Sequence, residues 1–151
     1  MKKSLLLIYI LVFSRTLFVG CSDDDKEVEI LTSNFVLGEP YRWNLSKQKD
    51  MFHIINNYAE LQDYIEAVDG SKVAVNAPDF DKYTLILASG TTQSGVAKIE
   101  TKLIKHNDID YTFEVYVFTN MATVVEGYIV AVTVPRLPNN AKVVKKAMVK
   151  L

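Results

Sequence analysis

The chain has little of the side-chain chemistry on which many enzymes depend. It holds one cysteine, Cys21, and two histidines, His53 and His106, in 151 residues. Two histidines without a paired spacing such as His-x-x-x-His do not predict a zinc site. The sequence also contains neither a Gly-x-Ser-x-Gly motif nor a Gly-Lys-Ser or Gly-Lys-Thr motif. We therefore expect no catalytic residue, no metal and no cofactor.

Positive charge is not in excess either. Lys2, Lys3 and Arg15 precede Cys21, and no acidic residue does. Removing residues 1–20 from the total of 17 bases and 18 acids therefore leaves 14 bases against 18 acids, a formal net charge of −4. Binding to nucleic acid depends on a concentrated positive surface. Nucleic acid is therefore not an expected partner.

The chain lacks an apolar run long enough for a membrane helix. Lys2 and Lys3 precede an apolar run over residues 5–13, well short of the roughly 20 residues that cross a bilayer. A basic start followed by a short apolar run is typical of an export signal peptide. The segment that follows, Leu17-Phe18-Val19-Gly20-Cys21, resembles a bacterial lipobox. Residues 1–20 are therefore predicted to be a signal peptide that is cleaved between Gly20 and Cys21.

Cys21 is predicted to carry the lipid anchor. The only cysteine of an exported chain has no intramolecular disulfide partner, and a thioether linkage to diacylglycerol would give it a role. A free thiol is the alternative. Such an anchor makes the membrane itself a partner of the protein.

The lipidated Cys21 and the acidic residues after it are predicted to form a tether, residues 21–27. They begin with Ser22, Asp23, Asp24 and Asp25. This order resembles the export signal that moves Bacteroidetes lipoproteins to the outer face of the outer membrane. We expect a lipid-anchored outer-membrane protein exposed at the cell surface, with a periplasm-facing domain as the alternative.

Residues 28–151 are predicted to form a single α+β domain. Residues 51–55 are short and apolar, as a buried strand is. Asn57 and Glu60 have the spacing of a helix N-cap and its reciprocal acid. Apolar residues at helical spacing follow: Leu61, Tyr64, Ile65 and Val68. The pattern predicts an amphipathic helix over residues 58–68.

From residue 83 onward the pattern changes to strands. The predicted strands cover residues 83–88, 96–104, 111–118, 124–134 and 143–151, and Lys145, Lys146 and Lys150 of the last are expected to face water. Sequential strands with short connections mostly pair antiparallel, and a lone helix must bury its apolar face against them. We predict a mainly antiparallel sheet of five to seven strands, curled or folded into a small sandwich, packed by the helix.

The second half of the chain carries a family resemblance. Asp79-Phe80-Asp81-Lys82 enters an apolar strand, a glycine-bearing loop covers residues 90–95, and Val132-Thr133-Val134-Pro135 precedes a closing apolar strand. In this order the features resemble the carboxyl-terminal domain of the protease complex subunit PrcB family of small bacterial lipoproteins. The resemblance implies a non-enzymatic partner that supports another surface protein.

Three further sequence features have both a functional and a structural interpretation. Ser94 lies in a predicted hairpin loop, where turn formation accounts for it better than catalysis. The segment 106–110 has alternate acids that could bind calcium, but it lacks the glycine and glutamate of a full calcium loop and is predicted to be a turn. Tyr41, Arg42 and Trp43 suit a protein or sugar interface, although core packing is the favoured interpretation.

The function expected from these observations is a non-catalytic binding or accessory lipoprotein for a protein or glycan partner, with binding residues that the sequence does not identify. One alternative is a hydrolase that uses two carboxylates in unlike environments. Its candidate acids are Asp79, Asp81, Asp108, Asp110 and Glu126. Another alternative is a protease inhibitor with an exposed loop over residues 134–140, which contains two prolines.

Overall fold

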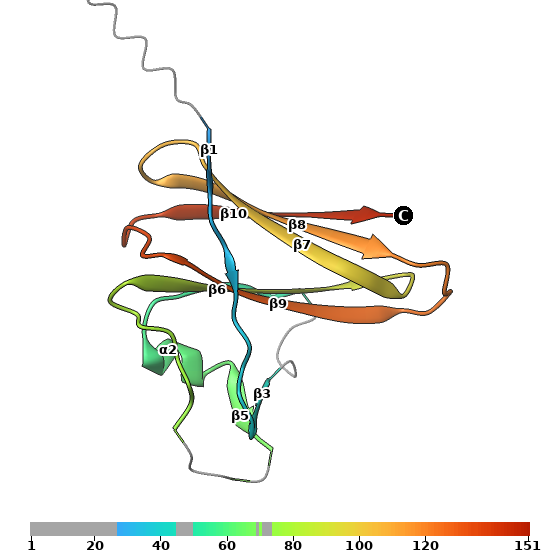
Figure 1. Cartoon of the computed structure of the whole chain (residues 1–151), viewed down its shortest axis with the longest axis horizontal. Helices are drawn as coiled ribbons and strands as arrows, with labels where there is room; N and C mark the ends of the chain where they lie inside the picture. The colour runs from blue at the N-terminus through green and yellow to red at the C-terminus, as the bar shows by residue number, and fades with distance from the viewer. Residues whose placement is uncertain (1–26, 45–49, 69, 71–73) are drawn as a thin grey trace, which may run out of the picture.

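Two four-stranded sheets pack face to face in the computed structural model, which describes residues 27–44, 50–68, 70 and 74–151 (Figure 1). Sheet A has the order β1 (Val28–Ile30), β7 (Val96–Lys105), β8 (Asp110–Thr119), β10 (Lys142–Lys150). Sheet B has the order β2 (Ser33–Asn34), β9 (Glu126–Pro135), β6 (Tyr83–Thr92), β4 (Phe52–Ile55). A third layer, below sheet B in Figure 1, contains the helix α2 (Tyr58–Gln62) and a ribbon of β3 (Tyr41–Trp43) and β5 (Ile65–Ala67).

The predicted α+β class is wrong. Strands make up 55% of the described residues and helix only 4%, with ten strands in three sheets instead of five to seven in one sheet or small sandwich. The only α-helix in the described part of the chain has five residues, so it cannot cover a sheet face as the predicted helix over residues 58–68 was expected to do. The third layer is made largely by the β3–β5 ribbon and irregular chain.

The helix begins where the sequence predicts and ends early. The Asn57 side chain accepts a hydrogen bond from the Glu60 backbone N–H at 2.9 Å, and the Glu60 carboxylate accepts one from the Asn56 N–H at 2.7 Å. Beyond Gln62 the chain pairs with β3: Asn44 N–H donates to Tyr64 O at 2.8 Å, and Ile65 lies opposite Trp43. Short helices are marginal by themselves. Long-range strand pairing therefore overrides the helical spacing of Tyr64 and Ile65.

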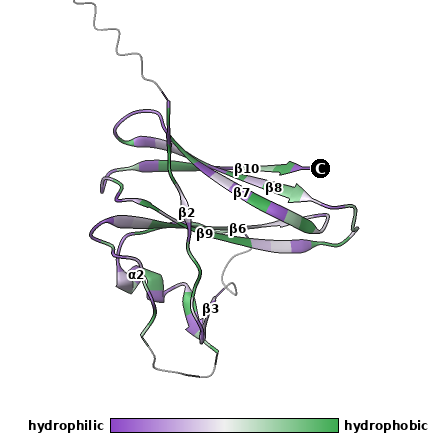
Figure 2. Cartoon of the chain, viewed as in Figure 1, coloured by the Kyte–Doolittle hydropathy of each residue, from purple (hydrophilic) through white to green (hydrophobic). Residues whose placement is uncertain are grey.

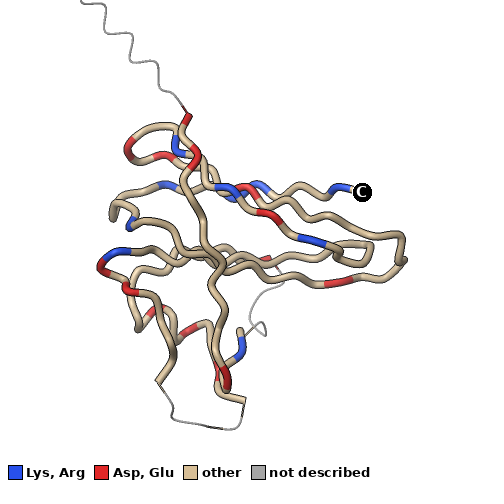
Figure 3. The backbone as a smooth tube through the Cα atoms, in the orientation of Figure 1, with Lys and Arg blue, Asp and Glu red and all other residues tan. Residues whose placement is uncertain are grey.

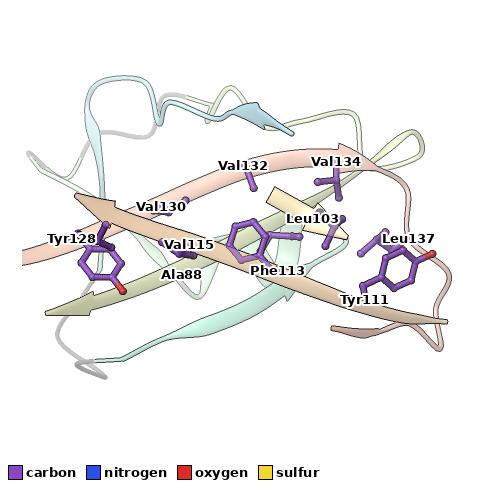
Figure 4. Close-up of a cluster of buried hydrophobic side chains, with 12 residues drawn as sticks. Ala88, Leu103, Tyr111, Phe113, Val115, Tyr128, Val130, Val132, Val134 and Leu137 are labelled. Carbon is purple, nitrogen blue, oxygen red and sulfur yellow. The ribbon is translucent and has the colours of Figure 1, made fainter. Parts of the chain in front are cut away.

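The main core lies between sheets A and B. Alternate residues of β8 point inward, and Phe113, Val115 and Val117 are fully buried. They pack against inward residues of β6 and β9, among them Ala88, Val130 and Val132 (Figure 4).

A second core lies on the other face of sheet B. Leu85 and Leu87 of β6 are fully buried there with Leu61 of α2, and Trp43 packs against the same cluster. Because both faces of sheet B are covered, β6 is buried along most of its length, and its residues 85–88 form a consecutive apolar run. Figure 2 colours the strands of both sheets by hydropathy. Strand β6 continues to Thr92, beyond the predicted residues 83–88. Gly90 allows the strand to pass close to Tyr128, because a Cβ at this position would overlap the Tyr128 ring.

The chain crosses repeatedly between the two sheets. The β6–β7, β8–β9 and β9–β10 connections each join a strand of one sheet to a strand of the other, and β10 consequently runs parallel to β8. The β7–β8 pair is a hairpin within sheet A. Residues 28–36, here called the strap, cross from β1, which pairs with β7, to β2, which pairs with β9. The strap therefore joins sheet A to sheet B along one side of the sandwich (Figure 1).

Candidate functional site

The carboxylates proposed for hydrolysis are not brought together. Asp79 accepts from Lys82 at 2.8 Å, and this hydrogen bond lowers the pKa of its exposed carboxyl. Asp108 is paired with Lys105 at 2.8 Å, which likewise lowers its pKa. Asp79 and Asp81 precede the start of β6, which pairs with the end of β9. Glu126 is at the start of β9, and its carboxylate accepts a hydrogen bond from the Val96 N–H at 2.8 Å. No pair of these acids has the unlike environments that acid–base catalysis needs.

Ser94 lies in a connection between the sheets and not in the predicted hairpin. Its carbonyl accepts a hydrogen bond from Thr92 Oγ1. Neither histidine contacts its hydroxyl: His53 bonds to Tyr64, and His106 bonds to Glu27 and Thr112. The geometry gives this serine no general base.

The segment 106–110 forms a turn held by its own side chains. The Asn107 carboxamide oxygen accepts from the backbone N–H groups of Ile109 and Asp110, at 3.0 and 2.9 Å. Its amide nitrogen donates to Asp110 at 2.7 Å. This geometry agrees with the turn interpretation, since the polar groups that would bind calcium are already used. Within the described ranges, no group of three His, Cys, Asp or Glu residues could hold a metal ion.

The predicted inhibitor loop is anchored to the domain. Val134 and Pro135 belong to β9, and Leu137 is buried in the main core. The Arg136 guanidinium donates to the carbonyls of Asn56 and Phe80 at 2.8 and 3.1 Å. Pro135, Arg136 and residues 138–140 are exposed, but β9, the Arg136 hydrogen bonds and the buried Leu137 hold this segment against the domain.

The Tyr41-Arg42-Trp43 segment is strand β3. Trp43 packs edge-to-face on Phe35, with ring centroids 6.1 Å apart, in agreement with the core-packing interpretation. Arg42 is exposed and paired with Glu66 at 2.6 Å. Cys21 and the residues of the signal peptide and export signal lie outside the described residues. In the part that the structure describes, no helix is long and apolar enough to cross a membrane.

The outer face of sheet A carries charges and aromatic rings that are paired with one another. Three of the ten residues of β7 and four of the nine residues of β10 are lysines, so lysine concentrates in this layer (Figure 3). The Lys150 ammonium lies 4.3 Å from the Tyr116 ring centroid. The Tyr116 hydroxyl donates to Glu114 at 2.5 Å, which lowers the Glu114 pKa, and Lys146 lies 3.5 Å from the same carboxylate. This face is therefore largely self-satisfied.

Lys145 departs from its prediction as a water-facing residue. It is half-buried, and its ammonium donates to the Ser89 carbonyl of sheet B at 3.2 Å. It therefore bridges the two sheets where β10 and β4 lie at their edges.

A groove of about 600 Å³ opens beside the strap, between the edges of the two sheets. Its walls are strap residues, residues 99–102 of β7, and residues 129–131 of β9. Apolar groups of Phe35, Val36, Ile99 and Ile129 line it. Glu29 and Glu100 stand at its rim with Lys102, which is paired with Glu29 at 2.9 Å. The groove can hold a ligand against apolar side chains and exposed strand backbone, but it contains no reactive cluster.

Comparison with known proteins gives no relative for this chain. No family model matches it, and neither a curated protein nor a solved structure does. The resemblance to the PrcB family therefore stays a prediction.

The groove was not identifiable from the sequence. Its residues come from the strap, β7 and β9, which meet only through sheet pairing. The strap residues precede those of β7 by more than sixty positions, and those of β9 follow more than twenty-five positions later. One pattern could have pointed to it. Residues 127–131 form an apolar strand segment without a charged residue, whereas β10, the long strand at the edge of sheet A, is rich in lysine.

Proposed function

We propose that this protein is a non-catalytic binding or accessory lipoprotein, anchored in the outer membrane through Cys21 and displayed at the cell surface. The observation that carries the proposal is the groove between the sheet edges, which offers apolar side chains and strand backbone to a partner. Six of the twelve residues that line the groove are apolar and six are polar or charged. Ligand sites are typically concave and contain polar groups that fix the orientation of the ligand. The favoured partner is a protein, because strand backbone is a surface on which another polypeptide pairs.

The lipid anchor is supported by the order of features at the amino terminus. A basic start, a short apolar run and a glycine before the only cysteine suit a bacterial lipoprotein. The first described residue, Glu27, contacts His106 beside the β7–β8 turn. Glu27 thus lies at one end of the sandwich, and the other end of sheet A is about 30 Å away along β8.

The hydrolase alternative has less support. Four of its candidate acids are exposed, and the half-buried Asp110 accepts a hydrogen bond from the Asn107 amide. The pKa shifts of Asp79 and Asp108 are downward, away from a proton-holding carboxyl. The inhibitor alternative is weakened by the buried position of Leu137. The accessory role implied by the PrcB resemblance is consistent with the proposal and adds no residue to it.

The test is a pull-down of the wild-type lipoprotein from gently solubilised outer membranes, with protease shaving of intact cells. The control is Cys21→Ala, which removes the predicted anchor. We expect labelling with a radioactive fatty acid in the wild type alone, cleavage of the domain on intact cells, and a stoichiometric protein partner.

Three results would contradict parts of this proposal. Equal lipid labelling of wild type and Cys21→Ala would exclude the anchor. Protection of the domain on intact cells would exclude surface display and favour the periplasm-facing alternative. A domain that is exposed but captures no protein would leave glycan binding as the remaining form of the binding role, to be tested on immobilised surface polysaccharide.

A further inference from the structure

The strap leaves part of the β9 edge open. Phe35 N–H donates to Ala131 O at 2.8 Å, so the backbone of Ala131 faces the strap. Backbone groups in an antiparallel strand face the same edge at every second residue. Ile129 and Gly127 therefore also direct their N–H and C=O groups outward. The strap pairs only with residues 131–133, so neither Ile129 nor Gly127 has a strand partner at this edge among the residues that the structure describes.

Three other edges of the sandwich carry features that oppose strand addition. The β10 edge has four lysines in nine residues. Strand β7 has a bulge between Val96 and Lys98, and its first N–H is occupied by the Glu126 carboxylate. Strand β4 is only four residues long. Lysines, bulges and short length are the devices by which proteins block edge-to-edge pairing.

The β9 edge has none of these devices between residues 127 and 131. Its register with β6 is continuous over all ten pairs, and this segment contains no charged residue and no proline. Pro135 is at an outward-facing position of the same strand, two residues beyond the strap pairing. The open segment is thus a regular strand edge that lacks protection on one side.

The groove beside this edge determines what can pair with it. Phe35, Val36 and Ile99 offer apolar contacts to the alternate side chains of an extended chain. Glu29 and Glu100 are each paired with a lysine, Lys102 at 2.9 Å and Lys98 at 2.5 Å, so these four charges balance. Glu126, at the end of the open edge, has no such ion pair among the described residues and is the unbalanced charge. A second copy would bring the same acids and a formal charge of −4 against this surface, which disfavours self-association. Charge complementarity favours a neutral or basic segment.

We propose that the open edge at Gly127 and Ile129 captures an extended, neutral or basic segment of a protein partner, which adds to sheet B as a further strand beside the groove. This inference rests on the proposed binding function and names its mode. The strap already shows the pairing geometry over residues 131–133, and the partner segment continues that pairing along β9.

The decisive variant is Gly127→Pro, with Gly127→Ala as its matched control. Proline removes the outward N–H and leaves the inward ladder to β6 intact, as Pro135 does at its own position. Alanine keeps the N–H, and the nearest atom to its Cβ would be Gly90 O at 3.9 Å, an ordinary contact. Both variants should retain the thermal stability of the wild type within a few degrees.

The probe is a phage-displayed library of random ten-residue peptides, selected on the mature chain with Cys21→Ala. We expect selected peptides of alternating apolar character without acidic residues. Their affinity should be unchanged in Gly127→Ala and about tenfold lower in Gly127→Pro, because one backbone hydrogen bond is lost and a carbonyl of the peptide is left without a donor. Backbone amides of Gly127 and Ile129 should become protected from exchange when peptide binds.

The outcomes separate this inference from the broader function. Failure to select any peptide, or equal affinity for Gly127→Pro and Gly127→Ala, overturns strand addition. A concentration-dependent dimer that Gly127→Pro abolishes would assign the edge to a second copy and also overturn it. In the outer-membrane pull-down, a partner retained by Gly127→Pro would contradict this inference alone, whereas no partner for the wild type would contradict the proposed protein-binding function.

Discussion

Sheets A and B differ in how many of their faces are covered. Sheet B is packed on both sides, by sheet A and by the layer of α2 and the β3–β5 ribbon, so β6 is almost wholly buried. Sheet A is covered on one side only. Phe113, Val115 and Val117 of β8 are buried against sheet B, and exposed charged residues such as Lys98 and Glu100 lie on β7. The edges differ in how well they are protected from strand addition. The edge of sheet A at β10 carries four lysines, whereas the β9 edge of sheet B is open beyond its short pairing with β2.

This difference assigns stability and binding to different parts of the molecule. The faces of sheet B contribute most of the buried apolar contacts, whereas its β9 edge is incomplete and available to a partner. Sheet A has exposed charges on its outer face and lysine at its edge, which favours solubility over pairing. Four changes test this division, and they follow in order of expected effect.

The two faces of β8 should respond very differently to truncation. Phe113 is fully buried between the sheets and stacks near Phe52, with ring centroids 6.1 Å apart. Phe113→Ala should lower the free energy of unfolding by about 3–5 kcal/mol. Phe118→Ala, on the outer face of the same strand, should cost about 1 kcal/mol or less. Urea denaturation of both variants measures the contrast, and equal losses would contradict a one-sided sheet A.

Glycine substitutions probe the tight packing inside sheet B. A Cβ on Gly90 would overlap the ring of the buried Tyr128, so Gly90→Ala should destabilise by about 1–3 kcal/mol. Gly127→Ala, on the neighbouring strand, has space and should be near neutral. Adding Tyr128→Leu to Gly90→Ala should make the loss smaller than the sum of the two single losses. Strictly additive losses would mean that the Tyr128 ring is not the obstacle.

The cap of α2 tests how much the outer layer depends on its short helix. Asn57→Ala removes the acceptor for the Glu60 N–H and should cost about 1 kcal/mol. Asn57→Asp retains an acceptor and is the control. Thermal denaturation compares the two, and a loss as large as that of Phe113→Ala would show that the outer layer is not secondary to the main core.

His53 should give a small dependence of stability on pH. Burial lowers its pKa below the usual value of 6.5, so the folded state favours the neutral ring. The unfolded chain therefore binds more protons below about pH 6.5, and stability should fall as the pH decreases from that value toward the lowered one. His53→Gln should remove this contribution. Urea titrations at pH 7.5 and 5.5 measure it, and an identical pH dependence in both proteins would contradict it.

The sequence predicted local elements better than their assembly. Alternation in residues 96–104 and the capping spacing of Asn57 and Glu60 both correspond to structure, because each depends on neighbours in the chain. The helix to Val68 was wrong because residues 65–67 pair with β3, more than twenty positions earlier. No local pattern reports that pairing.

The candidate site was beyond prediction for the same reason. The groove exists because the strap crosses from β7 to β9 and stops pairing after Phe35. Residues such as Gly127 carry no reactive group and belong to no catalytic motif, so the sequence alone does not mark them as functional. The acids proposed for catalysis were identifiable by type, but only the fold shows that Asp79 and Glu126 lie near opposite ends of sheet B.

Amide hydrogen exchange, measured by NMR on the mature chain with Cys21→Ala, tests the open edge most directly. Val130 directs its N–H toward β6, and Ile129 directs its N–H outward. The account predicts that Ile129 exchanges at least a hundredfold faster than Val130, as expected for an amide without a strand partner beside one inside the ladder. Equal protection of the two amides would mean that the β9 edge is already paired, and it would contradict the proposed docking site.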